Sequence, residues 1–229
     1  MRRVTALLLC LCFLPLPVRG RETKYVALTF DDGPSGKYTR QLLDGLAERE
    51  VKATFFLCGY RIKDYGELAQ RIYEEGHDIG IHGYSHKNMK TMSRRDIAAE
   101  IRNTQDLLPE GCVPKLLRPP GGCCSDGVRQ VAQARQLAIL SWSVDPQDWA
   151  LRDSDAIKTA VLKRVRDGDV VLLHDMSASS VKAALEIVDS LLEEGFEPVT
   201  VSQLAKLRSV RLKPGQVYTR FAVKEEEKK

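Results

Sequence analysis

Short apolar runs alternate with amphipathic stretches along most of this chain, and this alternation constrains the fold more than any other feature of the sequence. A short apolar run between turn signals is typical of a buried strand. Strands that alternate with helical patterns form parallel βαβ units, because each helix returns the chain to the starting edge of the sheet. Seven such runs occur, and they are Val26–Phe30, Ala53–Cys58, Asp78–Ile81, Lys115–Leu117, Leu137–Trp142, Val170–Leu173 and Pro198–Val201.

Helical patterns with apolar residues on one face lie between most of these runs. Ser93 is a suitable N-cap for one of them, and Gly195 ends the last one. About seven parallel strands with helices between them close naturally into a barrel, and a doubly wound open sheet is the alternative. The four patterns are Tyr38–Glu50, Arg94–Leu108, Ser154–Arg166 and Val181–Glu194.

The two ends of the chain differ from its body, residues 21–212, which is long enough for one domain with a full core. Residues 1–20 are typical of a secretory signal peptide, since Arg2 and Arg3 precede an apolar core that is short for a bilayer span. Cleavage is expected after Gly20, and an uncleaved membrane anchor is the alternative. Residues 213–229 are polar and end in a run of charges, which predicts a frayed C-terminal tail.

The charge of the chain excludes one class of partner. The formal net charge is +4, but the leader holds three of the 35 Lys and Arg residues and no acidic residue. Without the leader the net charge is +1. A nearly neutral chain lacks the basic excess that binds phosphates, so we expect no nucleic-acid partner.

Four cysteines follow the leader: Cys58, Cys112, Cys123 and Cys124. An even number in an exported chain permits disulfides, and Cys112 is the expected partner of Cys123 or Cys124. Cys58 ends an apolar run and is expected to be a small buried hydrophobic residue. A four-thiolate metal site is disfavoured because no C-x2-C spacing occurs.

Two adjacent carboxylates, Asp31 and Asp32, follow the first apolar run, and an H-x3-H pair, His82 and His86, follows the third. Taken singly, an Asp-Asp-Gly-Pro string is more often a plain turn, and an H-x3-H pair is more often incidental. The combination is much rarer. Two imidazoles and one carboxylate make a three-ligand metal site with room for water, and the second carboxylate is then free to act as a base. A metal ion, a water and a base together favour hydrolysis.

Polar residues also follow three other apolar runs. Arg118 follows the fourth run, Asp145 and Asp148 follow the fifth, and His174 and Asp175 follow the sixth. The active sites of α/β folds lie at the carboxyl ends of their strands, and a parallel barrel gathers those ends around one pocket. We therefore expect five polar clusters to share one site.

In sequence order these clusters resemble the five motifs of the NodB-type polysaccharide deacetylases, carbohydrate esterase family four. The resemblance extends from about Val26 to Val201. It implies a distorted (β/α) barrel and metal-dependent removal of N-acetyl groups from amino-sugar polymers. The matching segments are Thr29-Phe30-Asp31-Asp32-Gly33, His82-x3-His86, Arg118-x-Pro120, Asp145-x2-Asp148-Trp149 and Leu172-x-His174.

The resemblance implies a metal centre with an adjacent base. Asp32, His82 and His86 resemble the ligands of one divalent ion, for which Zn²⁺ is the most suitable, although several other divalent ions accept similar ligands. Asp31 resembles the general base that takes a proton from the attacking water. Arg118 resembles the partner that fixes the Asp31 carboxylate, a task that suits its rigid fork of donors.

The resemblance also implies a general acid and a binding pocket. His174 resembles the acid that protonates the departing amine, and Asp148 resembles the carboxylate that keeps this imidazole charged. Asp145 is a weaker candidate for that role and is compatible with a simple turn. Trp149 and Leu172 resemble the walls of the pocket for the acetyl methyl, and core packing is compatible with both.

One position departs from the family pattern. Gly121 stands where the family usually has a Tyr whose backbone N–H helps to stabilise the oxyanion. A glycine keeps this donor and loses only a side chain of the substrate groove, which bears on substrate preference more than on chemistry. Of the remaining polar residues, His77 is expected to be structural, and Asp175 has no assigned role.

We therefore expect an exported, cell-wall-associated enzyme that acts on peptidoglycan, with chitooligosaccharides and O-acetylated xylan as alternatives. A non-catalytic wall-binding protein of the same fold would need a broken motif, and none is broken. An iron oxygenase that binds its metal through two His and one carboxylate is a third possibility. It is disfavoured because it would give Asp31 and His174 no role. We expect a monomer that meets a membrane only through an uncleaved leader.

Overall fold

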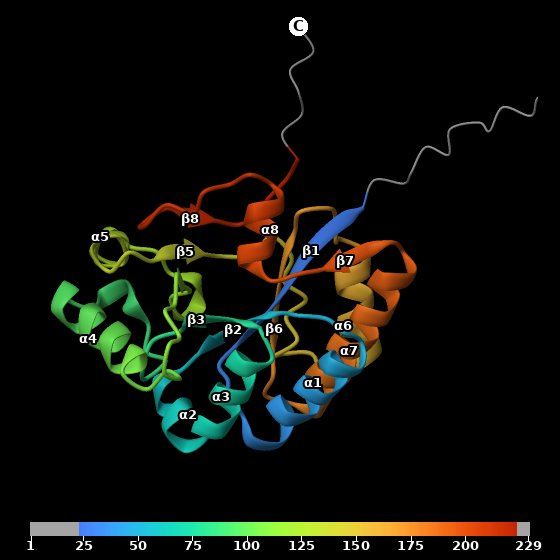
Figure 1. The fold of residues 1–229 in the computed structure, drawn as a ribbon, viewed down its shortest axis with the longest axis horizontal. Helices are drawn as coiled ribbons and strands as arrows, with labels where there is room; N and C mark the ends of the chain where they lie inside the picture. Colours follow the sequence, from blue (N-terminus) through green and yellow to red (C-terminus); the bar gives the residue numbers. More distant parts are fainter. Residues whose placement is uncertain (1–22, 224–229) are drawn as a thin grey trace, which may run out of the picture.

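One curled parallel sheet organises the computed structural model, which describes residues 23–223 (Figure 1). Each apolar run of the sequence contributes a strand to this sheet, and one further strand comes from the C-terminal segment. The strands in this range are β1 (Lys24–Asp31), β2 (Thr54–Leu57), β3 (Asp78–Ile81), β4 (Leu116–Leu117), β5 (Ala138–Leu140), β6 (Val170–His174), β7 (Phe196–Pro198) and β8 (Val217–Tyr218).

The sheet closes into a distorted barrel. Its strands follow the order β6-β1-β2-β3-β4-β5-β8, neighbouring strands are parallel, and β7 pairs with the beginning of β1. After β5 the chain returns to β6, where Val144 pairs with Val171 and the backbone N–H of Leu172 donates to the carbonyl of Val144 at 2.9 Å. This bridge links the segment after β5 to β6, and a second bridge, between Asp169 and Arg220, links the segment after β8 to the start of β6. The prediction of a distorted barrel of parallel strands is therefore confirmed, and the open sheet is not formed.

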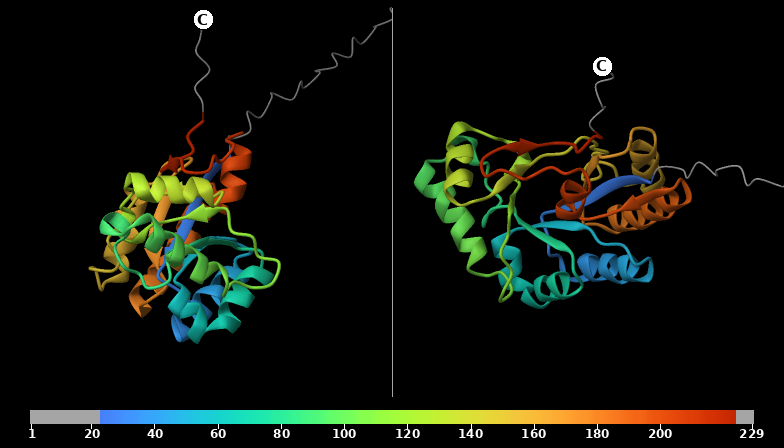
Figure 2. Two further views of the ribbon diagram at one scale, coloured as in Figure 1. Left: turned by 90° about the vertical axis from the view of Figure 1, so that its left-hand side faces the viewer. Right: turned by 45° about the horizontal axis from the view of Figure 1, so that its top comes forward.

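Helices cover the outside of the barrel in two main groups (Figures 1 and 2). One group packs beside β1 and β6 and the other beside β3, β4 and β5. The first group is α1 (Gly36–Glu48), α6 (Ser154–Leu162) and α7 (Ala178–Glu193), and the second is α4 (Arg94–Gln105) and α5 (Asp126–Ala134). The others are α2 (Gly59–Asp64), α3 (Gly66–Glu74), α8 (Val201–Leu207) and the 3₁₀ segments η1 (Met89–Thr91) and η2 (Pro120–Gly122).

All four predicted helices form, together with α2, α3, α5 and α8, which were not predicted, and the seventh predicted strand ends earlier than expected. The prediction placed that strand at Pro198–Val201, but β7 ends at Pro198 and Val201 begins α8. Thr200 and Gln203 form a reciprocal capping box, in which the Thr200 hydroxyl accepts from the backbone N–H of Gln203 at 3.2 Å and the Gln203 side chain accepts from that of Thr200 at 3.0 Å. This capping box starts a helix where the apolar run alone indicated a strand.

Side chains along β1 alternate between the helices and the barrel interior. Leu28 and Phe30 pack in the apolar cluster beside α1 and α7. Ala27 packs in a separate cluster that includes interior residues of β2, β4, β5 and β6. By the same alternation Thr29 and Asp31 face the interior. The register of β1 therefore places the Asp31 carboxylate inside the barrel, at the end where the strands finish.

Residues 217–221, which lie within the segment predicted as a frayed polar tail, belong to the barrel. β8 pairs with β5 through Ile139 and Leu140. Phe221 is only 2% exposed, and its ring stacks on that of Tyr218. The burial of one aromatic ring outweighs the polarity of its neighbours.

The expected signal peptide, residues 1–20, and the last residues, 224–229, lie outside the described residues. Between residues 23 and 223, no helix has both the length and the apolar character that a membrane crossing requires.

The expected disulfide does not form among the described residues. Cys58, Cys112, Cys123 and Cys124 are all free thiols. Cys112 packs against the apolar cluster beside α1 and α7, whereas Cys124 packs against the one beside α4 and α5. Closeness in sequence therefore does not bring these sulfurs together. Cys58 is fully buried, as predicted.

Candidate active site and metal centre

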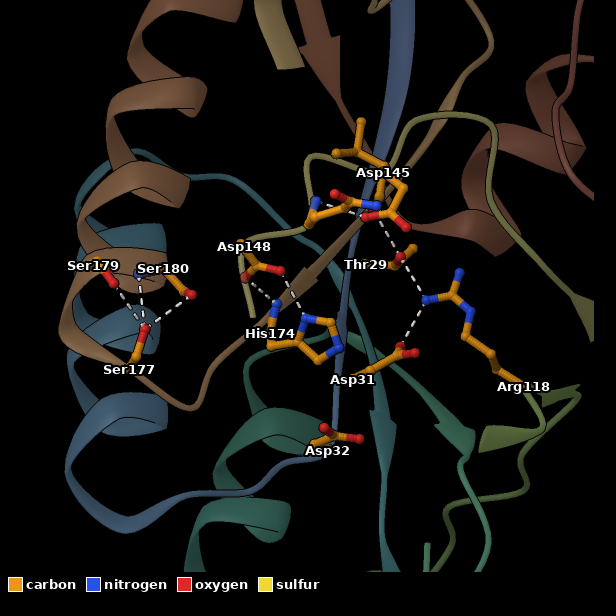
Figure 3. A network of polar contacts seen from close by, with 12 residues as sticks. Thr29, Asp31, Asp32, Arg118, Asp145, Asp148, His174, Ser177, Ser179 and Ser180 are labelled. Atoms are coloured by element: carbon orange, nitrogen blue, oxygen red, sulfur yellow. Dashed lines mark hydrogen bonds and ion pairs between the residues drawn. The ribbon is translucent and has the colours of Figure 1, made fainter. Parts of the chain in front are cut away.

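The candidate site lies where the parallel strands end (Figure 3). Asp31 ends β1, His174 ends β6, and the two residues are paired in the register of these strands. His82 follows β3 directly, and Arg118 follows β4, where its backbone N–H donates to the carbonyl of Ile81 at 2.9 Å. Because the ladder of hydrogen bonds continues past the strands, the backbone positions of these side chains are fixed by the sheet itself.

Asp32, His82 and His86 form a three-residue cluster. Asp32 Oδ1 lies 3.3 Å from His82 Nε2 and 3.0 Å from His86 Nε2, and one ligand atom of each residue lies within 4.8 Å of the others. Asp32 and His86 have φ angles of 74° and 57°. Such left-handed conformations are uncommon outside glycine and concentrate at functional sites. The three ligands predicted from the sequence are thus brought together, two of them by an unusual backbone.

The hydrogen bonding of His82 shows that a cation fits this cluster. Its Nδ1 lies 2.7 Å from the carbonyl oxygen of Arg118, which can only accept, so Nδ1 carries the proton. In a neutral imidazole Nε2 then directs a lone pair toward Asp32 Oδ1. That oxygen is buried and has no hydrogen-bond partner within residues 23–223. Facing lone pairs repel unless a positive charge lies between them, and this set of ligands suits a divalent metal ion.

The titration of the cluster reflects the same attraction for positive charge. Burial raises the pKa of Asp32, but the closeness and charge of the His82 and His86 imidazoles outweigh it, so the pKa of Asp32 lies well below its usual range. The close approach of the Asp32 carboxylate, 3.0 Å from His86 Nε2, raises the pKa of His86 above its ordinary value. The His86 side chain is 43% exposed, so this part of the site is open to solvent and substrate.

Glu100 holds the loop between the two histidines, and sequence analysis missed it. This residue lies on α4, and its Oε2 accepts from the backbone N–H groups of Tyr84 at 2.8 Å and Ser85 at 2.7 Å. Its Oε1 accepts from the hydroxyl of Ser85 at 2.8 Å. In the sequence Glu100 is one more acid on an amphipathic helix, which gives no signal that separates it from a solvated side chain.

Asp31 is fixed by Arg118. Nη1 of Arg118 donates to Asp31 Oδ1 at 2.7 Å, and the two residues are 0% and 3% exposed. Arg118 also donates to the Thr29 hydroxyl at 2.8 Å and to two backbone carbonyls at the end of β5. Burial lowers the pKa of Arg118, and the charge of Asp31 partly restores it. With Oδ1 engaged, Asp31 Oδ2 faces the cluster, 3.7 Å from His82 Nε2.

His174 forms a pair with Asp148. Nδ1 of His174 lies 2.7 Å from Asp148 Oδ1, and the backbone N–H of His174 donates to Asp148 Oδ2 at 2.9 Å. Burial alone would lower the pKa of His174. The hydrogen bond to Asp148 and the negative charges of Asp148, Asp31 and Asp32 outweigh burial and raise this pKa to about 9. The imidazole is therefore a proton donor near neutral pH.

The predicted pocket residues lie in different surroundings. Trp149 is 68% exposed and lines a cavity of about 600 Å³ together with Asp148 and His174. Leu172 is buried within β6, two residues before His174 and on the same face of the strand. Gly121 has a φ angle of 66°, and no atom lies within 4 Å of the position that a Cβ would occupy. Space is thus available beside Gly121 where the family usually has a larger residue.

Two other polar residues serve the structure. Asp145 Oδ1 accepts from the backbone N–H of Gln147 at 2.7 Å, which closes a turn. Burial lowers the pKa of His77 to about 4. Nδ1 of this neutral imidazole accepts from the backbone N–H of Ala53 at 3.0 Å, as expected for a structural histidine.

Asp175, which had no predicted role, lies beneath the turn that follows Asp32. It is fully buried, and its carboxylate accepts from the hydroxyl of Thr39. A Cβ on Gly33 would lie 2.7 Å from both oxygens of Asp175, so only glycine permits this close approach. Burial raises the pKa of Asp175 to about 7. The glycine of the Asp-Asp-Gly-Pro string is thus needed for packing as well as for the turn.

The site combines three chemical functions around one point: a place for a divalent cation, a carboxylate with a free oxygen, and a protonated imidazole. These are the groups that hydrolysis of an acyl bond requires.

Comparison with known proteins identifies the family that uses this arrangement. Residues 19–140 match the polysaccharide deacetylase family. The chain belongs to this family. The predicted membership is thereby confirmed, and with it the expectation that the chain comes from a family of enzymes.

Individual polysaccharide deacetylases share much of this chain. It is 37% identical over 190 residues to the peptidoglycan-N-acetylmuramic acid deacetylase PdaC of Bacillus subtilis, a match that covers 82% of this chain and 40% of that protein. It is 36% identical to a peptidoglycan-N-acetylglucosamine deacetylase of Bacillus cereus, with 81% of this chain and 90% of that protein covered. The chain thus spans well under half of the first relative and nearly all of the second.

The fold is shared with solved structures. A family 4 acetyl xylan esterase from Clostridium thermocellum, solved in complex with a cobalt ion, superposes with a TM-score of 0.80 at 32% sequence identity. The superposition covers 86% of this chain and 98% of that one. The distorted barrel is thus the fold of known carbohydrate esterases.

Proposed function

We propose that this chain is a metal-dependent N-deacetylase of amino-sugar glycans and that its substrate is peptidoglycan. One observation carries the proposal: the Asp32–His82–His86 cluster lies beside a buried Asp31 with one free oxygen and near a His174 that is paired for proton donation. Membership of the polysaccharide deacetylase family supports it, and two of the relatives described above are peptidoglycan deacetylases by name.

Asp32, His82 and His86 would hold one divalent ion, and two imidazoles with one carboxylate favour Zn²⁺. Such an ion would polarise the acetyl carbonyl and acidify the attacking water. The protein must then hold the ligands in place. The carbonyl of Arg118 fixes the ring of His82 through Nδ1, and Glu100 fixes the loop that carries His86.

Asp31 would accept the proton of the attacking water at Oδ2. Arg118 prevents rotation of the carboxylate by binding Oδ1 from a fully buried position. A carboxylate that is held by a single rigid donor keeps its second oxygen in one place, so less reorganisation is needed during proton transfer.

His174 would donate its proton to the amide nitrogen as the C–N bond breaks. An amine leaves only when it is protonated, so amide hydrolysis needs this acid. Asp148 keeps the imidazole charged and orients it through Nδ1, and its other oxygen accepts from the backbone N–H of His174. Trp149 and Leu172 would border the acetyl methyl, and Gly121 would line the substrate groove.

We further propose that the protein acts outside the cytoplasm, at the cell wall, as a monomer. The expected signal peptide at residues 1–20 supports export, and a peptidoglycan substrate requires it. Interaction with a membrane would then be limited to an uncleaved leader.

Acetate release tests this function directly. The full chain would be incubated with peptidoglycan glycan fragments, chitotetraose and O-acetylated xylan, and the loss of acetyl groups would be followed by mass spectrometry. We expect peptidoglycan fragments to be the preferred substrate. A preference for chitotetraose or for xylan would assign the alternative glycan, and no release from any of them would favour a non-catalytic glycan-binding protein.

Metal dependence is tested by His86→Ala, with Lys87→Ala as the matched control. Lys87 is the exposed neighbour of His86 and lies outside the cluster. His86→Ala should lose bound zinc and activity together, whereas Lys87→Ala should retain both. Full activity in protein that has been stripped of metal would rule out the proposed mechanism.

A further inference from the structure

The cavity beside His174 is larger than an acetyl group requires. It has a volume of about 600 Å³, and its lining includes Asp32, Asp148, His174, Trp149 and Arg152 together with the start of α7. Pockets of roughly 300–1,000 Å³ hold whole small ligands. A part of the substrate beyond the acetamide therefore fits into this cavity.

Arg152 gives this cavity a positive charge. Its side chain is exposed and has no ion-pair or hydrogen-bond partner among residues 23–223. Among the acids nearby, Asp32 belongs to the cluster proposed to hold the metal, and two others make hydrogen bonds of their own. Asp148 is bound to His174, and Asp153 caps α6 by accepting from the backbone N–H groups at its start, at 2.8 and 3.1 Å. The guanidinium is therefore free to bind a group that enters the cavity.

The start of α7 adds hydrogen-bond donors to the same cavity (Figure 3). Ser177, Ser179 and Ser180 line it. The Ser177 hydroxyl donates to that of the buried Ser180 at 3.0 Å and lies 3.1 Å from that of Ser179, which is more accessible than Ser180. Hydroxyl donors and the positive end of a helix favour negative charge, as does Arg152. Two separate parts of the lining thus point to an anionic ligand.

The chemistry of the substrate indicates where such an anion is carried. In the proposed reaction the amide nitrogen would lie at His174, so the sugar ring attached to it would extend toward the cavity that His174 lines. N-acetylmuramic acid differs from N-acetylglucosamine by a lactyl ether on a carbon next to the acetamido carbon, and the lactyl group ends in a carboxylate.

We propose that Arg152 binds a carboxylate carried on the sugar carbon next to the acetamido carbon, so that the cavity is a subsite for the free lactyl group of N-acetylmuramic acid. The subsite rests on the proposed function, because it takes His174 as the residue that faces the amide nitrogen. Arg suits this ligand because its planar fork can bind both oxygens of a carboxylate.

A substrate pair that differs only in charge tests the subsite. One substrate is a glycan tetrasaccharide with free lactyl carboxylates, and the other is the same tetrasaccharide with lactyl carboxamides. Wild-type protein should prefer the carboxylate form. Arg152→Ala should lower the ratio of the two kcat/KM values by about tenfold, the usual scale for a lost hydrogen bond to a charged group. Arg152→Lys should recover part of this ratio, because it keeps the charge and loses the fork.

The matched control is Arg211→Ala. Arg211 is also exposed, and it precedes β8, at the end of the barrel opposite to the site. This variant should keep the wild-type ratio. A ratio that is unchanged in Arg152→Ala, or that falls equally in Arg211→Ala, would overturn the subsite.

Calorimetric binding of the same two tetrasaccharides separates this inference from the proposed function. If no glycan is deacetylated but Arg152→Ala still loses about tenfold binding selectivity for the carboxylate form, the proposed function fails and the carboxylate site stands. If acetate is released and Arg152→Ala binds and turns over both forms as wild type does, the function stands and the subsite fails.

Discussion

The two halves of the site are held in different ways. The ligand cluster (Asp32, His82, His86) lies on a turn and a loop, is partly open to solvent, and includes two residues with positive φ. Its central oxygen, Asp32 Oδ1, is buried and faces imidazole nitrogens. In the proposed mechanism a divalent cation would lie between these atoms and hold this half together.

The proton-transfer pairs (Asp31 with Arg118, His174 with Asp148) are held by the protein alone. Both carboxylates are buried, each makes a contact of 2.7 Å with its basic partner, and Asp31 and His174 end neighbouring strands. Under the proposed function, rigidity and metal binding are therefore separate: the sheet fixes the groups proposed to move protons, and the turn and loop carry the groups proposed to hold the ion.

The largest effect should come from breaking a proton-transfer pair without touching the cluster. Asp31→Asn keeps an oxygen for Arg118 but removes the acceptor for the proton of water, and His174→Ala removes the donor to the amine. Each should lower kcat by about 10²–10⁴-fold, the usual contribution of a general acid or base. Each should also keep its zinc, as measured by elemental mass spectrometry.

The control for these variants is Asp145→Asn, because Asp145 closes a turn outside the cluster and the pairs. It should retain activity and metal. If Asp31→Asn lost its zinc as well, the two halves would not be separable, and the comparison would fail.

A smaller effect, on metal affinity, should come from removing the side chain that holds the loop between His82 and His86. Glu100→Ala removes the acceptor for three donors of the loop between His82 and His86. Loss of such an outer partner typically weakens metal binding by about 10–100-fold. Zinc titration against a competing chelator would measure this change. Asp96→Ala, on the exposed face of the same helix, is the control. Equal zinc affinity in wild type and Glu100→Ala would show that the loop does not need Glu100.

The smallest effect should be a change in the pKa of His174 when a metal ion binds to the ligand cluster, because the two halves interact through their charges. In metal-free protein His174 should titrate near pH 9, above its ordinary value of 6.5, because nearby carboxylates favour the charged ring. Its contribution to folding stability should be fully present below pH 6.5 and should be lost as pH rises through about 9. Added zinc should lower this pKa, since a nearby cation disfavours the charged imidazole.

Titration of the His174 ring by NMR, with and without zinc, measures the coupling. Chemical denaturation at pH 6 and pH 10 would detect the loss of stability. A His174 pKa at the ordinary value in metal-free protein would show that Asp148 does not hold the imidazole charged.

Much of the fold could be predicted from the sequence because its signals are local. Apolar runs and turn residues located the strands, and the four helical patterns all formed. The errors arose where a long-range or capping interaction decided the outcome. Thr200 and Gln203 started a helix inside a predicted strand. Phe221 drew a polar segment into the barrel through contacts with residues far away in the sequence.

The site shows the same division. Asp31, Asp32, His82, Arg118 and His174 could be predicted because parallel strands place the residues at their ends together. Glu100 and Arg152 could not be predicted, since neither belongs to a motif. Only folding places Glu100 beside the loop between the two histidines and Arg152 in the lining of the cavity. The expected disulfide failed for a related reason, because Cys112 and Cys124 belong to different apolar clusters.

The sequence by itself determined the strands and the ordered motifs that identify the family. It also determined the alternation of side chains along β1, which places Asp31 on the interior face of the barrel. All of these depend on near neighbours in the chain. The tertiary structure alone decided which atoms face one another. It brings Asp32 Oδ1 to His82 Nε2, places the Arg118 guanidinium within hydrogen-bond distance of Asp31, and puts Arg152 in the lining of the cavity beside His174. Distances of a few ångströms between residues far apart in sequence depend on how the sheet closes and how the helices pack, and no local pattern encodes them.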